Sequence, residues 1–145
     1  MSFFNLRALH TSDYIRCKTM LLDIFGQVEL SQFIKAWDTR NDMTSFAVIA
    51  NHQIIGYILL DMHHKIQYLC VDPAFRNARL GSTLLQHSLD LLKQLGAKDI
   101  TLTTAKDARL TSWYAKFGFV VVKNLYDING DFLGADMTLN SLSSS

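Results

Sequence analysis

The sequence predicts a mixed α/β (α+β) fold built on one central, mostly antiparallel sheet. Three observations lead to this prediction. Short β-rich runs alternate with runs whose apolar residues have helical spacing. Residues 68–95 pass from a strand through a turn into a long helix. The chain has 145 residues, 49% of them hydrophobic and 19% charged, which is the size of one domain and enough for a sizeable core.

The first third of the chain predicts one strand followed by two helices. Alternating apolar and polar residues indicate the strand, and Thr11, Ser12 and Asp13 offer oxygens that could cap the helix after it. Gly26 stands where a glycine commonly ends a helix. The expected elements are a strand over 3–9, a helix over 13–25, a second helix over 29–37 and a loop over 38–42.

The middle third predicts two tight connections between strands, a turn and a long helix. Residues 51–53 separate two β-rich runs, and a second connection lies around 62–65. The third strand ends at Asp72 and Pro73, beyond which leucines recur at helical spacing as far as Gly96. The expected elements are strands over 45–50, 54–62 and 66–71, and a helix over 80–95.

The last third predicts a strand, a helix and two further strands. Asn129 followed by Gly130 is a strong turn signal between the last two strands. We expect a single domain over 1–140, and a flexible serine-rich tail over 141–145. The expected elements are a strand over 99–104, a helix over 108–116, and strands over 119–122 and 135–139.

Composition and charge exclude several classes of function. A net charge of +1 without a long basic run argues against a nucleic-acid surface. No apolar run approaches the roughly 20 residues of a membrane helix, and no leader-like segment opens the chain, so we expect a soluble cytoplasmic protein without membrane contact. Cys17 and Cys70 lack metal-type spacing and are expected to be buried free thiols in a reducing compartment.

The turn over residues 72–82 has the chemistry of an anion site. The first N–H groups of a helix have no intrahelical partner, and the helix dipole adds partial positive charge there. Arg76 and Arg79 add full charges, and Gly81 lets a ligand approach the backbone. The turn matches neither a P-loop nor the three-glycine dinucleotide fingerprint. It is therefore either a phosphate site or an ordinary strand-to-helix connection made of small and polar residues.

Residues 71–85 (VDPAFRNARLGSTLL) resemble the acyl-CoA loop of the GNAT superfamily of N-acetyltransferases. That loop is usually written Arg/Gln-x-x-Gly-x-Gly/Ala after a Val-x-Pro strand end. Arg76 and Gly81 match its first and last positions, and Arg79 stands in place of the middle glycine.

Residues 113–119 (WYAKFGF) resemble a second GNAT segment, Leu/Phe-Tyr-x-x-x-Gly-Phe. Asp107 stands where the family usually has an asparagine before this segment. The two motifs occur in the family's order, and the expected element order agrees with that of the family over nearly the whole chain. The resemblance therefore implies the GNAT fold, a twisted, mostly antiparallel sheet of about six or seven strands that is splayed at the acyl-CoA site and flanked by about four helices.

The resemblance also implies acetyl-CoA as the co-substrate and no metal. The pantetheine arm would lie along one strand like an added strand, and the pyrophosphate would meet the amides of the loop. Arg76 is the best side-chain contact for the pyrophosphate. The cofactor-binding residues implied in this way are Leu69, Cys70, Val71, Arg76, Asn77, Ala78, Arg79, Leu80, Gly81, Ser82 and Asp107.

The implied activity is transfer of the acetyl group of acetyl-CoA to a primary amine by direct attack. This reaction needs a deprotonated amine, a donor for the oxyanion and a proton for the departing thiolate. Tyr114 matches the family's proton donor, whereas its pattern alone would indicate a core tyrosine. The acceptor stays open between a small amine or polyamine, an aminoglycoside-like compound, an amino acid, and a protein lysine or N-terminus.

The general base also stays open. A histidine has a suitable near-neutral pKa, but His63 and His64 fall in a predicted turn, where solvated histidines are common. A water chain to the bulk solvent would also serve. A metal site built from these two residues and His52 matches no common ligand spacing. The candidates for the base are Glu29, Asp61, His63, His64, Gln67 and Asp107.

Two rival classes of function remain. A non-catalytic GNAT-like module would hold acyl-CoA or a partner without turnover; Arg79 and Asp107 favour it, and Tyr114 disfavours it. A nucleotide-binding enzyme with the same loop would make the match at 113–119 accidental. Nine Phe, two Trp and five Tyr also lead us to expect apolar surface shared in a homodimer, unless these rings line the core and the substrate groove.

Overall fold

The computed structural model describes residues 4–26 and 30–140. Two short 3-10 helices, η1 (Thr11–Asp13) and η2 (Pro73–Ala78), accompany the regular elements. The helices are α1 (Tyr14–Phe25), α2 (Leu30–Asp38), α3 (Leu80–Gln94) and α4 (Arg109–Ala115). The strands are β1 (Asn5–Ala8), β2 (Phe46–Ala50), β3 (Gln53–Leu60), β4 (Lys65–Val71), β5 (Asp99–Thr103), β6 (Val120–Tyr126) and β7 (Phe132–Asn140).

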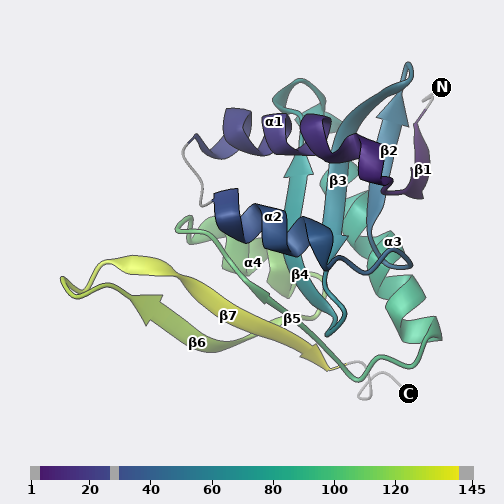
Figure 1. Cartoon of the computed structure of the whole chain (residues 1–145). Coiled ribbons are helices and arrows are strands. Elements are labelled where there is room, and N and C mark those ends of the chain that lie inside the picture. The colour runs from purple at the N-terminus through teal and green to yellow at the C-terminus, as the bar shows by residue number, and fades with distance from the viewer. Residues whose placement is uncertain (1–3, 27–29, 141–145) are drawn as a thin grey trace.

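The described strands form one seven-stranded sheet in the order β1-β2-β3-β4-β5-β7-β6. All neighbouring strands are antiparallel except β4 and β5, which are parallel. Figure 1 shows α1 and α2 in front of the sheet and α3 and α4 behind it. The expected mixed, mostly antiparallel sheet with about four helices is therefore confirmed. No helix of the described segments is long and apolar enough to cross a membrane.

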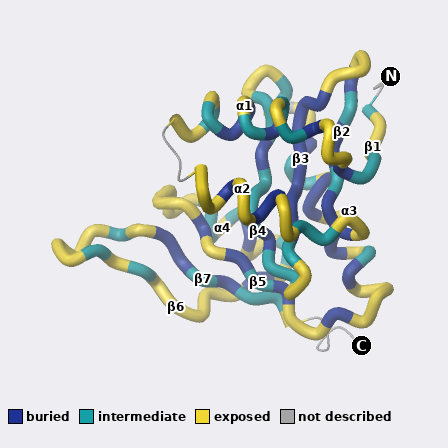
Figure 2. The backbone as a smooth tube through the Cα atoms, viewed as in Figure 1, coloured by how far each residue is buried: buried dark blue, intermediate teal, exposed yellow. Residues whose placement is uncertain are grey.

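Each face of the sheet has its own hydrophobic cluster. Leu84, Leu85 and Leu92 of α3 belong to the cluster behind the sheet, and Phe33 and Trp37 of α2 belong to the cluster in front. Because both faces of β3 are covered, all but the first of its residues are buried, as is usual for strands between two layers. Figure 2 shows this strand as dark blue along most of its length. Both cysteines are free and buried, as expected.

The hairpin of β6 and β7 is longer than the sequence predicts. Its strands end and begin at Tyr126 and Phe132, beyond the expected 119–122 and 135–139. Polar residues such as Lys123 and Asn124 interrupt the β-rich pattern on which the prediction depended. Figures 1 and 2 show the hairpin projecting from the body of the protein, with β6 mostly exposed along the edge of the sheet. The tail expected over 141–145 lies outside the described residues.

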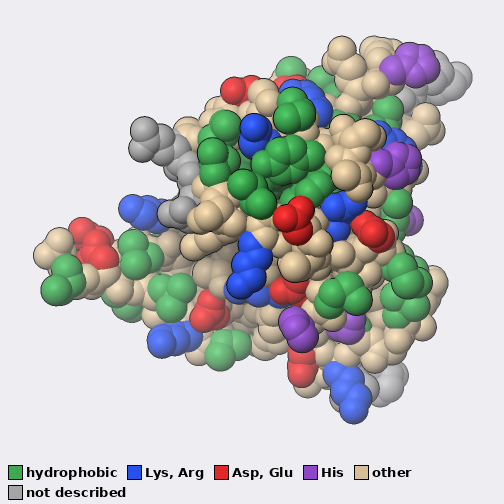
Figure 3. Space-filling model, in the orientation of Figure 1, with side chains coloured by type: hydrophobic (Ala, Val, Ile, Leu, Met, Phe, Trp, Pro, Cys, Tyr) green, Lys and Arg blue, Asp and Glu red, His purple; other side chains and the backbone are tan. Residues whose placement is uncertain are grey.

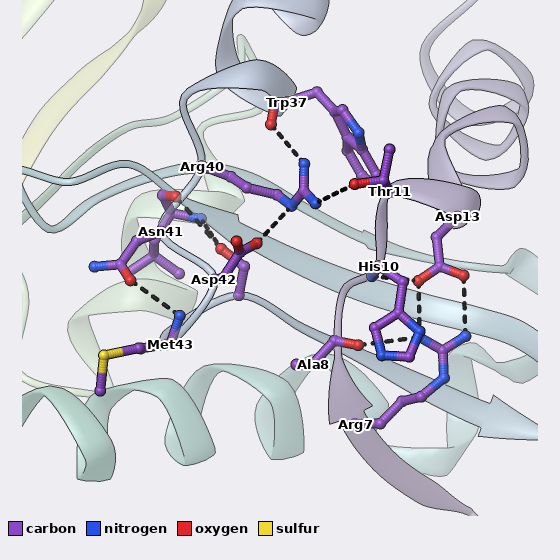
Figure 4. A network of polar contacts seen from close by, with 12 residues as sticks. Arg7, Ala8, His10, Thr11, Asp13, Trp37, Arg40, Asn41, Asp42 and Met43 are labelled. Atoms are coloured by element: carbon purple, nitrogen blue, oxygen red, sulfur yellow. Dashed lines mark hydrogen bonds and ion pairs between the residues drawn. The ribbon is translucent and has the colours of Figure 1, made fainter.

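Asp13 joins β1 to the start of α1, where it is the one of the three N-cap candidates that stands at the N-cap position. Its carboxylate accepts hydrogen bonds from the Arg7 guanidinium at 2.7 and 3.0 Å and from the His10 backbone N–H at 2.8 Å. No side-chain cap bond from Asp13 to α1 is formed. Figure 4 shows the two parallel bonds between Arg7 and Asp13. The Asp13 side chain is only 8% exposed, so this is a buried carboxylate held by a bidentate arginine.

We expect Asp13→Asn to lower the free energy of unfolding by about 1 to 3 kcal/mol at neutral pH, because it removes a charged hydrogen-bond acceptor from a buried position. Burial raises the pKa of Asp13, but the hydrogen bonds from Arg7 and His10 outweigh it and hold the pKa below its usual value. Since the folded-state pKa is the lower one, the stabilisation is complete above the unfolded value of about 4 and is lost as the pH falls through the folded value.

Urea unfolding of the wild type and Asp13→Asn at several pH values between 7 and 3 measures this difference. Asp107→Asn is the control, because Asp107 also pairs with an arginine, Arg109 at 2.8 Å, but the two side chains are 44% and 91% exposed. An exposed pair contributes little, so the control should change stability by less than about 1 kcal/mol. A difference for Asp13→Asn that does not shrink in acid would contradict the assignment.

Candidate active site

A cavity of about 1020 Å³ lies where β4 and β5 separate. These parallel strands pair at Lys65 with Thr101 and at Ile66 with Leu102, and no further pair joins them in the described residues. Beyond Ile66, β4 keeps β3 as its neighbour on one side and has the cavity on the other. The other walls come from the end of α1, the loop before α3, the end of β5 and α4. The sheet is thus split at its centre, as the resemblance implies.

The segment between β4 and α3 forms the basic end of the cavity. The Asp72 carboxylate accepts a hydrogen bond from the Ala74 N–H at 3.0 Å and so begins η2. Arg79 connects η2 to α3 with a left-handed backbone, φ 59° and ψ 30°. Glycine adopts this conformation without steric cost, which explains why the resembled loop has glycine there. The N–H groups of Gly81 and Ser82 follow in the first turn of α3, where helix amides have no intrahelical acceptor.

Most of the cofactor-binding residues implied by the resemblance line this cavity. Leu69 and Val71 line it from β4, and their backbones run along its edge. Asp107 lines it at the start of α4. The complete set of predicted site residues among its lining is Leu69, Val71, Arg76, Arg79, Gly81, Ser82, Asp107 and Tyr114.

The remaining described side chains among the predicted residues, those of Cys70, Ala78 and Leu80, do not line the cavity. The Cys70 side chain is 2% exposed and belongs to the hydrophobic cluster under α1 and α2. Leu80 is equally buried in the cluster on the other face. Asn77 and Ala78 belong to η2. Burial raises the pKa of the Cys70 thiol to about 11, so this thiol is not a nucleophile at neutral pH.

Tyr114 lines the cavity from α4. Its ring packs against Trp113 and Phe119, with ring centroids 4.9 and 5.8 Å apart. Burial, together with the nearby Cys70 thiol, raises the pKa of the Tyr114 hydroxyl to about 12. The hydroxyl is therefore protonated at neutral pH and carries a proton that it can donate.

The cavity reaches from one face of the sheet to the other. Tyr114 belongs to the cluster behind the sheet, whereas Tyr68 lies in front, where its ring is 5.2 Å from that of Phe33 in α2. Thr103 also faces the front, because side chains alternate along a strand and its neighbour Leu102 is buried in the cluster behind. A ligand in this cavity can be approached from the front while it contacts Tyr114 behind.

The structure separates the candidates for the general base. The Asp61 carboxylate accepts hydrogen bonds from the N–H groups of His63 and Lys65, at 2.8 and 3.0 Å, and from the Gln67 side chain at 2.9 Å. Asp61 therefore closes the turn between β3 and β4, in which His63 is exposed and His64 has a φ of 65°. Of this group, Gln67 lines the cavity.

Asp107 also lines the cavity, but its carboxylate is engaged. It accepts hydrogen bonds from the Arg109 N–H at 2.9 Å and from the Arg109 guanidinium at 2.8 Å. These bonds hold the pKa of Asp107 below its usual value, which makes it a weaker base. Glu29 lies outside the described residues. No group of three or more His, Cys, Asp or Glu in the described parts of the chain could hold a metal ion.

Sequence reasoning missed several cavity residues. The end of α1 supplies an apolar wall, and the residues from Leu102 to Asp107 carry the opposite one. The only available signal was the run of apolar residues that continues up to Gly26 at the end of the first helix. The missed lining residues are Leu21, Ile24, Phe25, Ile66, Tyr68, Leu102, Thr103, Thr104, Ala105, Lys106, Leu110 and Trp113.

A smaller cavity of about 490 Å³ lies between the start of α1 and the β2–β3 hairpin. Its lining includes Arg7 and Asp13, which bind each other, and Arg16. The Arg16 guanidinium donates to the Ile54 carbonyl at 3.1 Å and to Asp72 at 3.2 Å. These polar groups are engaged with one another, so the split in the sheet is the better candidate for the site.

The mixed sheet that is split beside the loop before α3 is the fold that the two sequence motifs imply. The sequence model of the Acetyltransferase (GNAT) family matches residues 6–119, so the chain belongs to this family. The family expected from the two motifs is confirmed.

Individual relatives agree with this assignment. N-alpha-acetyltransferase 30 of Schizosaccharomyces pombe is 32% identical in an alignment of 91 positions that covers 57% of this chain and 61% of that protein. The chain thus spans about three fifths of the length of the curated relative that it matches.

Among solved structures, the ribosomal-protein-S18-alanine N-acetyltransferase from Escherichia coli has a TM-score of 0.80 at 19% identity, covering 95% of this chain and 94% of that one. Arabidopsis thaliana Naa50, in complex with the bisubstrate analogue CoA-Ac-MVNAL, has a TM-score of 0.75 at 17% identity, covering 93% and 97%. At these identities the likeness concerns the fold.

Proposed function

We propose that this protein is an N-acetyltransferase that transfers the acetyl group of acetyl-CoA to the α-amino group of a polypeptide. The observation that carries the proposal is the cavity through the split sheet, which joins a basic helix N-terminus at one end to Tyr114 and an open front face. Membership of the acetyltransferase family supports acetyl-CoA as the donor.

In this proposal the residues around the split hold acetyl-CoA. The pyrophosphate lies against Arg76, Arg79 and the first amides of α3, where charge and unpaired N–H groups favour an anion. The pantetheine arm hydrogen-bonds along β4 at the edge that β5 leaves unpaired. This arrangement brings the thioester toward Tyr114 in α4.

The reaction follows from this placement. The neutral acceptor amine approaches from the front and attacks the thioester carbonyl carbon, forming the C–N bond and placing negative charge on the carbonyl oxygen. When the C=O double bond re-forms from this oxyanion, the C–S bond breaks and CoA leaves as a thiolate. The Tyr114 hydroxyl gives its proton to this sulfur, the amine loses a proton to solvent, and the Tyr114 oxygen takes a proton back from solvent.

Two considerations support an α-amino acceptor. The proteins similar to this chain include an N-alpha-acetyltransferase and a ribosomal-protein-S18-alanine N-acetyltransferase. They also include Naa50 in complex with the bisubstrate analogue CoA-Ac-MVNAL. The α-amino group has an ordinary pKa of about 8, against about 10.4 for lysine, so far more of it is neutral and nucleophilic at pH 7. Figure 3 shows hydrophobic side chains gathered over α1 and α2. The end of α1 also lines the cavity, so an extended polypeptide on this surface would reach it.

Release of CoA thiol from acetyl-CoA tests the proposal. We expect turnover with peptides that carry a free α-amine, and none with the same peptides when the N-terminus is blocked and an internal lysine is left free. Equal release with both peptides would overturn the acceptor assignment. Tight calorimetric binding of CoA without release in the presence of any amine would favour a binding module instead.

Arg76→Ala is expected to weaken CoA binding by about 1.5 to 3 kcal/mol, because it removes a charge-assisted contact to the pyrophosphate. Arg76 is exposed, so the melting temperature should hardly change. Calorimetry with CoA measures the loss. Lys93→Ala is the control, because it removes a charge from the last turn of α3, at the other end of the helix from the loop. This variant should bind CoA normally. Pantetheine without phosphates should bind the wild type and Arg76→Ala alike; a difference there would contradict the contact.

We further propose a reducing, cytoplasmic compartment, which the two free and buried cysteines support. A homodimer stays a prediction. Exposed valines at 120–122 on the edge strand β6 are apolar surface that a second copy could cover. Light scattering that reports a 16.5 kDa particle at micromolar concentration would exclude the dimer.

A further inference from the structure

A short hydrogen bond links the front wall of the cavity to β7. The Thr103 hydroxyl oxygen lies 2.6 Å from a carboxylate oxygen of Asp136. The two residues are cross-strand partners in the antiparallel pairing of β5 and β7, so their side chains project from the same face of the sheet. Thr103 lines the cavity. Asp136 lies next to Thr103 on the same face of the sheet, but it does not line the cavity itself.

The direction of this hydrogen bond follows from the chemistry of its two groups. An ionised carboxylate can only accept hydrogen bonds, so the Thr103 hydroxyl must donate. The 2.6 Å separation is in the range of a bond from a hydroxyl to a carboxylate. A hydroxyl has one proton, and here that proton points to Asp136. The Thr103 oxygen is left with lone pairs alone, and a ligand in the cavity can bind it only by donating an N–H or O–H.

The surroundings of Asp136 leave its charge effective at the cavity. Its neighbour on β5 is the uncharged Thr103, and its cross-strand neighbour on β6 is Lys123. Lys123 and Asp136 are both among the residues that the structure describes, and their side chains form no ion pair. Figure 1 shows no helix in front of β7 and β6 at the projecting hairpin, so an acceptor can reach this face from solvent.

We propose that Thr103 and Asp136 form the docking site for the amine of the acceptor. The Thr103 hydroxyl oxygen accepts an N–H from the acceptor amine. Asp136 is a positioning residue: it fixes the orientation of that hydroxyl, and its negative charge attracts the amine as a cation, which loses a proton to solvent before the neutral amine attacks. This inference rests on the proposed acetyl transfer and deepens it, because it names the groups that recognise the amine.

The location of the pair suits this role. Thr103 faces the front of the sheet, whereas Tyr114 belongs to the cluster behind it. The amine is therefore bound on one face, and the proton for the thiolate is supplied from the other. Asp61 and Asp107 both accept hydrogen bonds from backbone and side-chain donors of their own, whereas the Asp136 carboxylate accepts its hydrogen bond from the cavity wall.

If the Thr103–Asp136 hydrogen bond only stabilises the sheet, the variants should behave differently. A cross-strand Thr–Asp bond on an exposed sheet would stabilise the fold slightly and would not affect acceptor binding. The chain offers a matched control, because Thr101 and Thr138 pair across the same two strands, on the same face, and neither lines the cavity. Thr101→Val and Thr138→Val should leave acceptor binding and turnover unchanged.

Calorimetry on the CoA-loaded protein tests docking without turnover. Two peptides are compared, one with a free α-amine and the other identical except that hydrogen replaces the amine. The wild type should prefer the amine peptide about 10- to 100-fold, as expected for a hydrogen bond that involves a charged group. Thr103→Val and Asp136→Asn keep the side-chain shapes, remove the hydroxyl or the charge, and should abolish most of this preference. Thr103→Ser should retain it.

Steady-state kinetics gives a second readout. Thr103→Val and Asp136→Asn should each raise KM for the peptide and lower kcat/KM about 10- to 100-fold, with KM for acetyl-CoA unchanged. The double variant should be about as impaired as the worse single variant, because the two residues act as one unit.

The outcomes separate the two proposals. Wild-type transfer to the amine peptide, with the Thr103 and Asp136 variants indistinguishable from the Thr101 and Thr138 controls, would overturn the docking site and leave the acetyltransferase intact. A fall in melting temperature with the amine preference preserved would also overturn it, in favour of the structural role. If the wild type neither binds nor acetylates any amine peptide, the proposed function fails and this inference fails with it.

Discussion

Tyr114→Phe is expected to lower kcat about 10²-fold while the binding of acetyl-CoA changes little. The substitution keeps the ring, which packs against Trp113 and Phe119, and deletes only the hydroxyl that we propose as the proton donor to the departing thiolate. General acid catalysis is worth about 10²- to 10⁴-fold, and a thiolate leaves fairly well unaided, so the lower end is expected. Single-turnover measurements with saturating acetyl-CoA isolate this step.

Tyr57→Phe provides the opposite control. The Tyr57 hydroxyl donates a hydrogen bond to the Cys17 carbonyl at 3.1 Å in the buried core, away from the cavity lining. Its removal should cost about 1 to 3 kcal/mol of stability, because a buried acceptor loses its partner, and should leave the single-turnover rate near normal. If Tyr114→Phe instead loses stability and keeps its rate, Tyr114 is a core tyrosine and the catalytic role is lost.

Gly134→Ala should destabilise the protein by about 3 to 5 kcal/mol, the largest loss that we expect from one methyl group. Gly134 has a φ of 140°, which side chains rarely adopt, and a Cβ there would overlap the Thr104 carbonyl oxygen and lie 3.1 Å from its carbon. Because that carbonyl is backbone, it cannot move aside without separating β5 from β7. Urea unfolding measures the loss.

Gly130→Ala separates backbone strain from this overlap. Gly130 also has a positive φ, 84°, but nothing lies within 4 Å of a Cβ built on it. Only the conformational cost of about 1 to 2 kcal/mol should remain. Equal losses for the two variants would show that the close approach of Thr104 contributes nothing. Since Thr104 lines the cavity, any folded Gly134→Ala protein should also bind CoA more weakly.

Local patterns in the sequence were enough for most of the fold. The change from period-two to helical spacing, with Pro73 between, located β4, the loop and α3, and the tight turn at Asn51 and His52 has the positive φ values typical of a short hairpin. These features depend on residues close together in the chain. The β6–β7 hairpin was underestimated because its strands contain polar residues exposed on an uncovered edge.

The candidate site could be predicted only in part, for a physical reason. The loop and Tyr114 lie in short motifs, whereas the front wall comes from strand pairing over long distances in sequence. Thr103 and Asp136 are 33 residues apart and meet because β7 inserts between β5 and β6. Nothing local to Asp136 distinguishes it from any exposed aspartate. For Arg79 the opposite holds. The sequence motif predicted its place in the loop, but nothing in the sequence predicted its left-handed backbone conformation.

The short contact between β4 and β5 makes this line the weakest seam of the sheet. Four strands from the first half of the chain lie on one side of it and three from the second half on the other, joined by two residue pairs. Backbone amides bordering such a seam should exchange with deuterium through local openings that cost less than global unfolding. We expect acetyl-CoA bound in this seam to take the place of a missing strand. At 100 times its Kd it should add about 2.7 kcal/mol to the free energy of unfolding. It should also slow deuterium exchange in the strands on both sides of the seam together.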